Sequence, residues 1–218
     1  FFKVVYRRHT NFSMEAIEQT LSGTAGLNSS VTATISRNGD LIGRTYVEFK
    51  VGCIDCNNQA IGPNLTNNLL KEVELEIGGQ RIDKHYGHWM TVWNELTEVN
   101  PTGSAVAMAD VGDPGANTVL YQKAQYNLGT GNTGSSWAWD ADIGPALVPL
   151  QFWFCRNPGL ALPLIALQYH EVKIKITFGG EDDLMAAAGT VTDTLAGNVG
   201  LWVDYIYLDT DERRRFAQ

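Results

Sequence analysis

The sequence predicts an all-β domain, a sandwich or jelly roll with one or two short helices and long loops. Three observations lead to this prediction. Apolar and polar residues alternate with the period of a strand in several segments, glycine-containing turns separate some of these segments, and a helical pattern dominates only one segment. With 218 residues, 44% of them hydrophobic, the chain is long enough to form one such domain with a sizeable core.

The predicted strands are the segments in which the alternation is clear. In residues 71–77, three apolar side chains share one face and three glutamates share the other. The same alternation is found in residues 31–35, 46–51 and 171–178. Strands with one apolar and one wet face are typical of antiparallel sheets. Residues 201–208 are apolar on both faces, so we expect this strand to lie centrally or beneath a partner.

Two glycine-containing dipeptides predict tight turns. Asn38-Gly39 lies between two strand-like segments and suits a type I′ hairpin, in which both central residues need positive φ. Gly78-Gly79 separates residues 73–77 from residues 81–83 in the same way.

Residues 86–99 have the pattern of a short amphipathic helix. Trp89, Val92, Trp93 and Leu96 recur at helical spacing. We therefore expect a helix that packs its tryptophans against the sheets.

The longest irregular segments are residues 100–145 and 179–200, which are rich in glycine, alanine and small polar residues. Loops of this length in a compact domain are usually functional or disordered. A second helical turn is expected near residues 160–167, although Pro163 limits its length.

The charge composition limits the classes of partner. Charged residues make up 18% of the chain, below the roughly 25% usual for soluble domains, which suggests that neighbours cover part of the surface. A net charge of −8 disfavours direct binding to nucleic acid. No segment reaches the roughly 18 consecutive apolar residues of a membrane helix. The three cysteines are an odd number, which favours a reducing compartment over a disulfide framework.

A metal site is not predicted. Cys53 and Cys56 form a lone C-x-x-C pair, whereas a structural zinc site needs a second pair of ligands. His85 and His88 could supply that pair, but we interpret them as hydrogen-bonding residues at the start of the helix.

No catalytic residue and no cofactor are predicted. The sequence contains no G-x-S-x-G, P-loop or H-E-x-x-H motif. The acidic residues 181–183 are interpreted as a solvated loop, because no EF-hand loop surrounds them.

Five residues are candidates for contacts with carbohydrate or with the outside. Asn11, Asn28 and Asn64 fit the N-glycosylation pattern, which occurs by chance in a chain rich in asparagine and threonine. Trp137 and Trp139 lie close to acidic residues in the longest loop. Exposed aromatic side chains beside carboxylates are what a carbohydrate-binding jelly roll would need, so this remains the alternative function. A hydrolase on the same fold is a third hypothesis, but no pair of carboxylates is singled out.

Four blocks carry a family resemblance that goes beyond composition: residues 1–15, 73–84, 149–163 and 204–217. Together they resemble the major capsid protein of the nucleocytoplasmic large DNA viruses, over nearly the whole chain. The resemblance implies a double jelly roll, of which residues 1–218 would form the first, eight-stranded antiparallel barrel. The N-terminal arm and the second barrel would then be absent, and both ends of the chain would be cut from a longer polypeptide.

The resemblance also implies a function without enzymatic activity. The protein would form homotrimeric, pseudo-hexagonal capsomers of an icosahedral shell. Its partners would be sister copies, neighbouring capsomers, and minor capsid and penton proteins. It would reside in the virion after assembly in the host cytoplasm. Residues 100–145 and 179–200 would form the outer loops.

Overall fold

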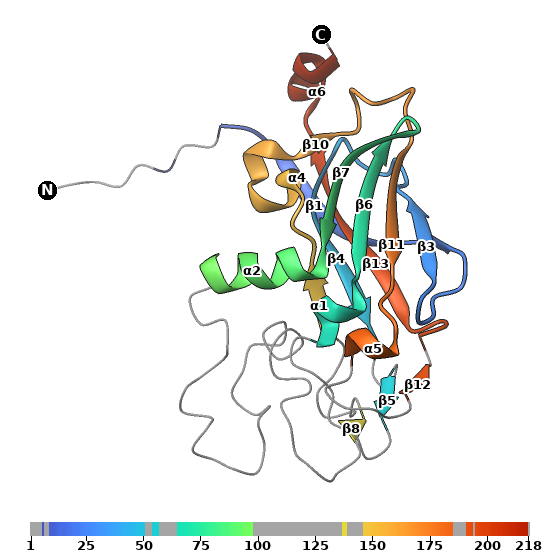
Figure 1. Cartoon of the computed structure of the whole chain (residues 1–218). Helices are drawn as coiled ribbons and strands as arrows, with labels where there is room; N and C mark the ends of the chain where they lie inside the picture. Colours follow the sequence, from blue (N-terminus) through green and yellow to red (C-terminus); the bar gives the residue numbers. More distant parts are fainter. Residues whose placement is uncertain are drawn as a thin grey trace, which may run out of the picture.

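Two antiparallel sheets packed face to face form the main body of the molecule (Figure 1). The computed structural model describes residues 6, 9–50, 54–56, 65–97, 137–138, 146–184, 191–193 and 195–217. Short helices and a small third sheet lie at the margins of this body.

The first sheet, sheet A, is built around β13 (Val199–Leu208). This strand pairs with β1 (Phe12–Gln19) on one side and with β4 (Leu41–Phe49) on the other. The far edge of β4 pairs with β9 (Ala146–Pro149) and with β10 (Leu162–Pro163). The strand that is apolar on both faces is therefore central, as its composition predicted.

The second sheet, sheet B, is centred on β11 (Val172–Thr177). It pairs with β3 (Ser30–Thr34) and with β6 (Glu72–Ile77). At the two edges lie β2 (Leu21–Ser22), beside β3, and β7 (Gln80–Tyr86), beside β6.

The order of the strands is that of a jelly roll. In chain order, the principal strands are β1, β3, β4, β6, β7, the β9/β10 pair, β11 and β13. Sheet A then contains the first, eighth, third and sixth of these strands, and sheet B contains the second, seventh, fourth and fifth. This order is produced by two Greek keys. The predicted eight-stranded antiparallel jelly roll is therefore confirmed.

The third sheet has the order β12 (Val191–Asp193), β5 (Ile54–Cys56) and β8 (Trp137–Ala138) and lies at the end of the molecule opposite α6 (Figure 1). The helices are α1 (Leu65–Leu69), α2 (Gly87–Thr97), α4 (Trp153–Arg156), η3 (Pro158–Leu160), α5 (Glu181–Leu184) and α6 (Thr210–Ala217). In the described part of the chain, none of these helices has the length and apolar character needed to cross a membrane.

The segments predicted as irregular differ in outcome. Residues 179–200 contain α5, β12 and the beginning of β13, so the prediction of one continuous loop was wrong there. Residues 100–145 lie outside the described residues except for β8. The helical turn expected near residues 160–167 is replaced by the end of η3, by β10 and by a turn over residues 164–169.

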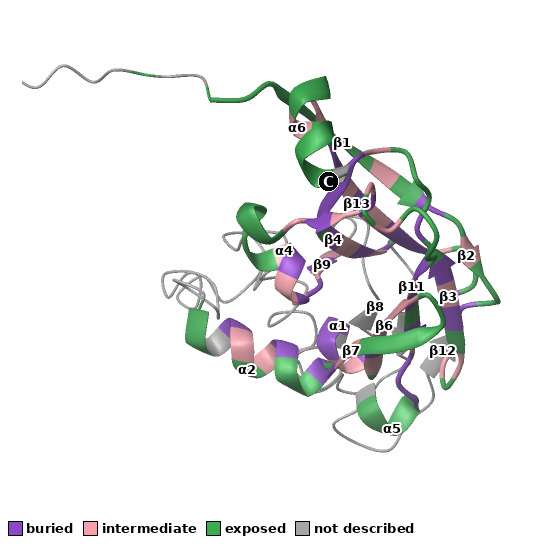
Figure 2. Ribbon diagram, turned by 90° about the horizontal axis from the view of Figure 1, so that it is seen from above, coloured by how far each residue is buried: buried purple, intermediate pink, exposed green. Residues whose placement is uncertain are grey.

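The core lies between sheets A and B, where the buried residues of both sheets form one cluster, and Figure 2 colours the buried residues purple along the ribbons. Phe49 of sheet A and Phe178, just after β11, pack edge to face with ring centroids 6.5 Å apart. Tyr205 is fully buried, and its hydroxyl donates a hydrogen bond of 2.6 Å to the backbone oxygen of Ser36. Burial of these large side chains supplies most of the stabilisation of such a domain, and the tyrosine hydroxyl is satisfied rather than stranded.

The two predicted tight turns have different outcomes. Gly78 and Gly79 have φ of 60° and 83° and join β6 to β7, so this hairpin is confirmed. Asn38 and Gly39 do not have positive φ, so the type I′ prediction was wrong. The reason is that β3 and β4 belong to different sheets, and the turn carries the chain from sheet B to sheet A. Glycine allows close packing there, because an added Cβ would lie 3.0 Å from Tyr205 Cβ.

The predicted helix exists as α2, but the face expected to be buried points outward. Met90 and Asn94 are buried, whereas Trp89 and Leu96 are 38% and 77% exposed. The cause lies at the start of the helix, where a Cβ on Gly87 would lie 1.8 Å from the backbone oxygen of a residue in α1. The helix therefore packs against α1 at Gly87, which has no side chain. Trp89 and Leu96 lie on another face of the helix and point away from the core.

Candidate functional site

The outer face of sheet B carries charged side chains in cross-strand pairs. Lys84 of β7 forms ion pairs with Glu72 and Glu74 of β6, and Arg81 lies 3.1 Å from Glu74. The hydrogen bond to Glu72 raises the pKa of Lys84. Exposed pairs of this kind add little stability but keep a surface hydrated. The interpretation of the β6 glutamates as a wet face is consistent with this arrangement.

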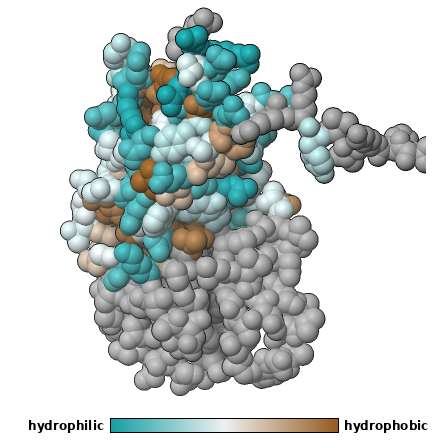
Figure 3. Space-filling view, turned by 180° about the vertical axis from the view of Figure 1, so that it is seen from behind, coloured by the Kyte–Doolittle hydropathy of each residue, from teal (hydrophilic) through white to brown (hydrophobic). Residues whose placement is uncertain are grey.

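The outer face of sheet A is more apolar. On the edge strand β1, Phe12 and Met14 are 61% and 56% exposed. Further along the same sheet, Tyr46, Trp202 and Leu147 are half-buried. The view from behind shows apolar patches among hydrophilic residues (Figure 3). Exposed apolar side chains gathered on one face of a domain are typical of an interaction site.

Polar groups on the outer face of sheet A are satisfied within the sheet. Trp202 Nε1 donates a hydrogen bond of 2.7 Å to Glu48 Oε2. Burial raises the pKa of Asp204, and the charge of Arg44 partly opposes that shift. On this face Glu48 and Asp204 are half-buried, whereas Glu18 and Arg44 are exposed.

The chain leaves the barrel through α6, which is anchored to the turn before β4. Asp40 Oδ2 accepts hydrogen bonds from the backbone N–H of Leu208 at 2.8 Å and from Arg213 Nε at 2.9 Å. At the same corner, Asn11 Nδ2 donates to Asp209 Oδ2 at 3.3 Å. This corner therefore holds the beginning of β1 and the exit of the chain together. No local sequence pattern predicts the partners Asp40 and Asn11, because they are far from residues 208–213 along the chain.

His85 and His88, the two histidines considered as zinc ligands, differ in their surroundings. His85 is buried, its ring contacts Phe152 with centroids 4.5 Å apart, and neither ring nitrogen has a hydrogen-bond partner among the described residues. Burial lowers the pKa of His85 to about 4. The expectation of an ordinary hydrogen-bonding histidine was therefore wrong for His85, while His88 is exposed on α2. In the described ranges no group of three or more metal-ligating side chains is close enough to hold an ion, and Cys53 lies outside them.

The candidate carbohydrate contacts remain predictions. Asn11 and Asn28 are exposed, and Asn28 has a φ of 57° in the turn before β3. Asn64 and Trp139 lie outside the described residues. Trp137 lies in β8, where it pairs with Cys56 of β5.

Comparison with known proteins gives a family and several relatives. The family described as "Major capsid protein N-terminus" matches residues 1–209. The major capsid protein of Pyramimonas orientalis virus is 51% identical over all of this chain and half of its own length. The major capsid protein of Paramecium bursaria Chlorella virus 1 is 40% identical over all of this chain and 45% of its own length. The chain therefore spans about half the length of these relatives.

Solved structures agree with these matches. The crystal structure of PBCV-1 VP54, fitted into a reconstruction of the virophage Sputnik, superposes with a TM-score of 0.70 at 38% identity, covering all of this chain and 47% of that one. The Faustovirus major capsid protein superposes with a TM-score of 0.62 at 13% identity, covering 99% of this chain and 57% of that one, which supports the fold alone. The resemblance of the four sequence blocks is thereby confirmed. The chain belongs to the major capsid protein family of the nucleocytoplasmic large DNA viruses and matches its N-terminal part.

Proposed function

We propose that this chain is the first of two jelly-roll barrels in a major capsid protein that builds the shell of an icosahedral DNA virus. In this proposal three copies of the whole protein form a pseudo-hexagonal capsomer. The role is structural and involves no catalysis. Family membership and the match to half of each relative's length support it.

The observation that carries the proposal is the contrast between the two sheets. Sheet B presents cross-strand ion pairs to water beside the exposed Ile82 and Tyr86 of β7, whereas the exposed Phe12 and Met14 of sheet A have no ion pair beside them on β1 among the described residues. A solvated monomer gains nothing from such exposure, but a barrel that packs against another barrel buries it. The outer face of sheet A along its edge strand β1 is therefore the surface that we expect to meet a sister barrel, with α6 leading the chain toward the second barrel.

The partners follow from the same proposal. They are sister copies, neighbouring capsomers, and minor capsid and penton proteins, all within the virion, after assembly in the host cytoplasm. Rotational symmetry reuses the same patch in every copy, so moderate contacts add up to a stable shell. Direct contact with the packaged nucleic acid is disfavoured by the net charge of −8.

The particle mass of the full-length protein, measured by light scattering, tests this proposal. The expected result is a trimer. Met14→Glu should weaken assembly, because it places a charge on the apolar face of an exposed edge strand. Thr34→Glu, an exposed position on sheet B, is the matched control and should assemble normally. A monomer under all salt conditions, or equal loss of assembly in both variants, would contradict the proposal.

A further inference from the structure

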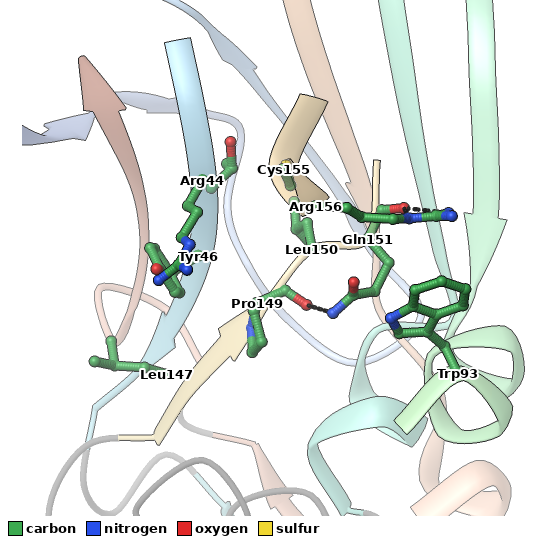
Figure 4. Close-up of a pocket in the computed structure, with 10 residues that line it drawn as sticks. Arg44, Tyr46, Trp93, Leu147, Pro149, Leu150, Gln151, Cys155 and Arg156 are labelled. Carbon is green, nitrogen blue, oxygen red and sulfur yellow. Dashed lines mark hydrogen bonds between the residues drawn. The ribbon is translucent and has the colours of Figure 1, made fainter. Parts of the chain in front are cut away.

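A groove with a volume of about 510 Å³ opens between sheet A and the outward side of α2. Arg44 and Tyr46 of β4 lie on one side of it, and Trp93, Gln151 and Arg156 lie on the other (Figure 4). This volume is in the range of sites that hold a ligand or a few side chains of a partner. The groove is separate from the exposed edge strand β1 that the shell proposal uses.

Arg156 is held in a fixed position on the wall of the groove. Its Nε and Nη2 both donate to the backbone oxygen of Gln151, at 3.0 and 2.8 Å. Its guanidinium lies over the ring of Trp93, 4.2 Å from the centroid. A guanidinium has five N–H donors, so the end formed by Nη1 and Nη2 keeps a parallel pair of donors. This pair matches the two oxygens of a carboxylate.

The positive charge of the groove is not neutralised by an ion pair in the described part of the chain. No carboxylate there lies within 4 Å of the guanidinium of Arg44 or Arg156, although Asp204 acts on Arg44 as a more distant charge. Among the described residues, the groove lining contains both arginines and no acidic residue. In a chain with a net charge of −8, this local excess of positive charge favours an anionic occupant.

The floor of the groove is apolar and neutral. Leu147 and Pro149 of β9 line it, Leu147 on the side of Tyr46 and Pro149 between Tyr46 and Trp93 (Figure 4). Cys155 also lines it, and burial raises the pKa of this thiol to about 11, so it carries no charge at neutral pH. A bare inorganic anion would leave these apolar side chains uncovered, whereas a peptide can cover them and supply a carboxylate.

We propose that this groove binds an extended acidic segment of a partner protein. One carboxylate of the segment would meet the free end of the Arg156 guanidinium, and a neighbouring apolar side chain would lie on Pro149 and Trp93. Arg44 on the opposite side would attract a second carboxylate. This inference goes beyond the shell role, which is measured by assembly and does not depend on the groove.

A labelled peptide of alternating glutamate and leucine tests the proposal on the full-length protein by fluorescence anisotropy. The expected result is salt-sensitive binding that becomes roughly tenfold weaker when the glutamates are replaced by glutamine, as expected for loss of a charged hydrogen bond. Arg156→Gln and Arg44→Gln should each weaken binding by a similar factor. Arg156→Lys should also weaken it, because lysine keeps the charge but lacks the parallel donors.

Arg214→Gln is the matched control, since Arg214 is exposed on α6 and is not one of the residues that line the groove, and it should bind normally. Because Arg156 also holds the Gln151 backbone, a thermal melt must show that its variants are folded, and Arg44→Gln provides an independent test. Equal binding of the glutamine peptide would overturn the proposal. So would full competition by inorganic phosphate at the same concentration as the peptide, or binding unaffected by Arg44→Gln.

Discussion

Arg213 Nε donates a hydrogen bond of 2.9 Å to Asp40 Oδ2, a contact between residues 173 positions apart in the chain. The same carboxylate oxygen accepts the backbone N–H of Leu208. Asp40 is 12% exposed at its side chain, whereas Arg213 is 49% exposed. We therefore expect Asp40 to contribute more to the free energy of unfolding than Arg213, because the carboxylate accepts a backbone N–H as well as the arginine.

We expect Asp40→Ala to lower the free energy of unfolding by roughly 1–3 kcal/mol, since two donors lose their acceptor. Arg213→Gln should cost less than about 1 kcal/mol, as is usual for a half-exposed ion pair. Urea unfolding measures both values, and limited proteolysis reports whether α6 is released. Equal costs for the two variants would show that the Leu208 hydrogen bond contributes nothing.

His85 makes stability depend on pH. Its pKa is lowered to about 4 in the folded protein by burial, whereas an unfolded histidine titrates near 6.5. The unfolded chain therefore binds more protons between these values, and stability is full above pH 6.5 and falls as the pH drops toward 4. From pH 7 to pH 5 the loss due to His85 should be about 2 kcal/mol.

Urea unfolding of the wild type and of His85→Phe at both pH values isolates this effect, because the carboxylates titrate in both proteins. The difference in stability between pH 7 and pH 5 should be smaller in the variant by about that amount. The phenylalanine should be tolerated, since the ring already packs on Phe152 and forms no hydrogen bond with a described residue. An identical pH dependence in the two proteins would refute the assignment.

Arg37 fixes the turn between β10 and β11. Its guanidinium donates to the backbone oxygens of Leu167, Gln168 and His170. Arg37→Lys cannot reproduce this fork, so it should destabilise the protein by roughly 1 kcal/mol and speed amide hydrogen exchange in residues 167–170. Arg81→Lys is the control, because Arg81 forms only an exposed ion pair, and it should change neither quantity.

Substitution of Gly87 tests whether the close contact between α2 and α1 determines which face of α2 is exposed. Alanine normally favours a helix over glycine by about 1 kcal/mol. Here the added Cβ would meet the backbone oxygens of Asn67 and Leu70 at 1.8 and 2.7 Å, so we expect Gly87→Ala to destabilise the protein by more than 2 kcal/mol, as severe overpacking does. His88→Ala, at the exposed neighbouring position, should be nearly neutral in thermal melts. A more stable Gly87→Ala variant would contradict the packing of α2 against α1.

Local sequence patterns predicted the strands and the Gly78-Gly79 hairpin, because alternation and positive φ are properties of neighbouring residues. They failed where the outcome depends on distant parts of the chain. The pattern of Trp89 and Trp93 predicted a helix but not which side would meet α1, since that is decided by a backbone contact of Gly87. The groove could likewise not be predicted from local patterns, because Trp93 and Arg156 are far apart in the sequence and contact each other only in the folded protein.

The position of β13 in sheet A has a consequence for how the protein is made. This strand is the last of the barrel to leave the ribosome, yet it lies between β1 and β4 and hydrogen-bonds to both. A nascent chain that has not reached Val199 holds β1 and β4 without the strand that joins them. Sheet A can therefore close only after synthesis of the barrel is nearly complete, and until then its apolar strands lack their central partner, a condition that favours aggregation of nascent chains.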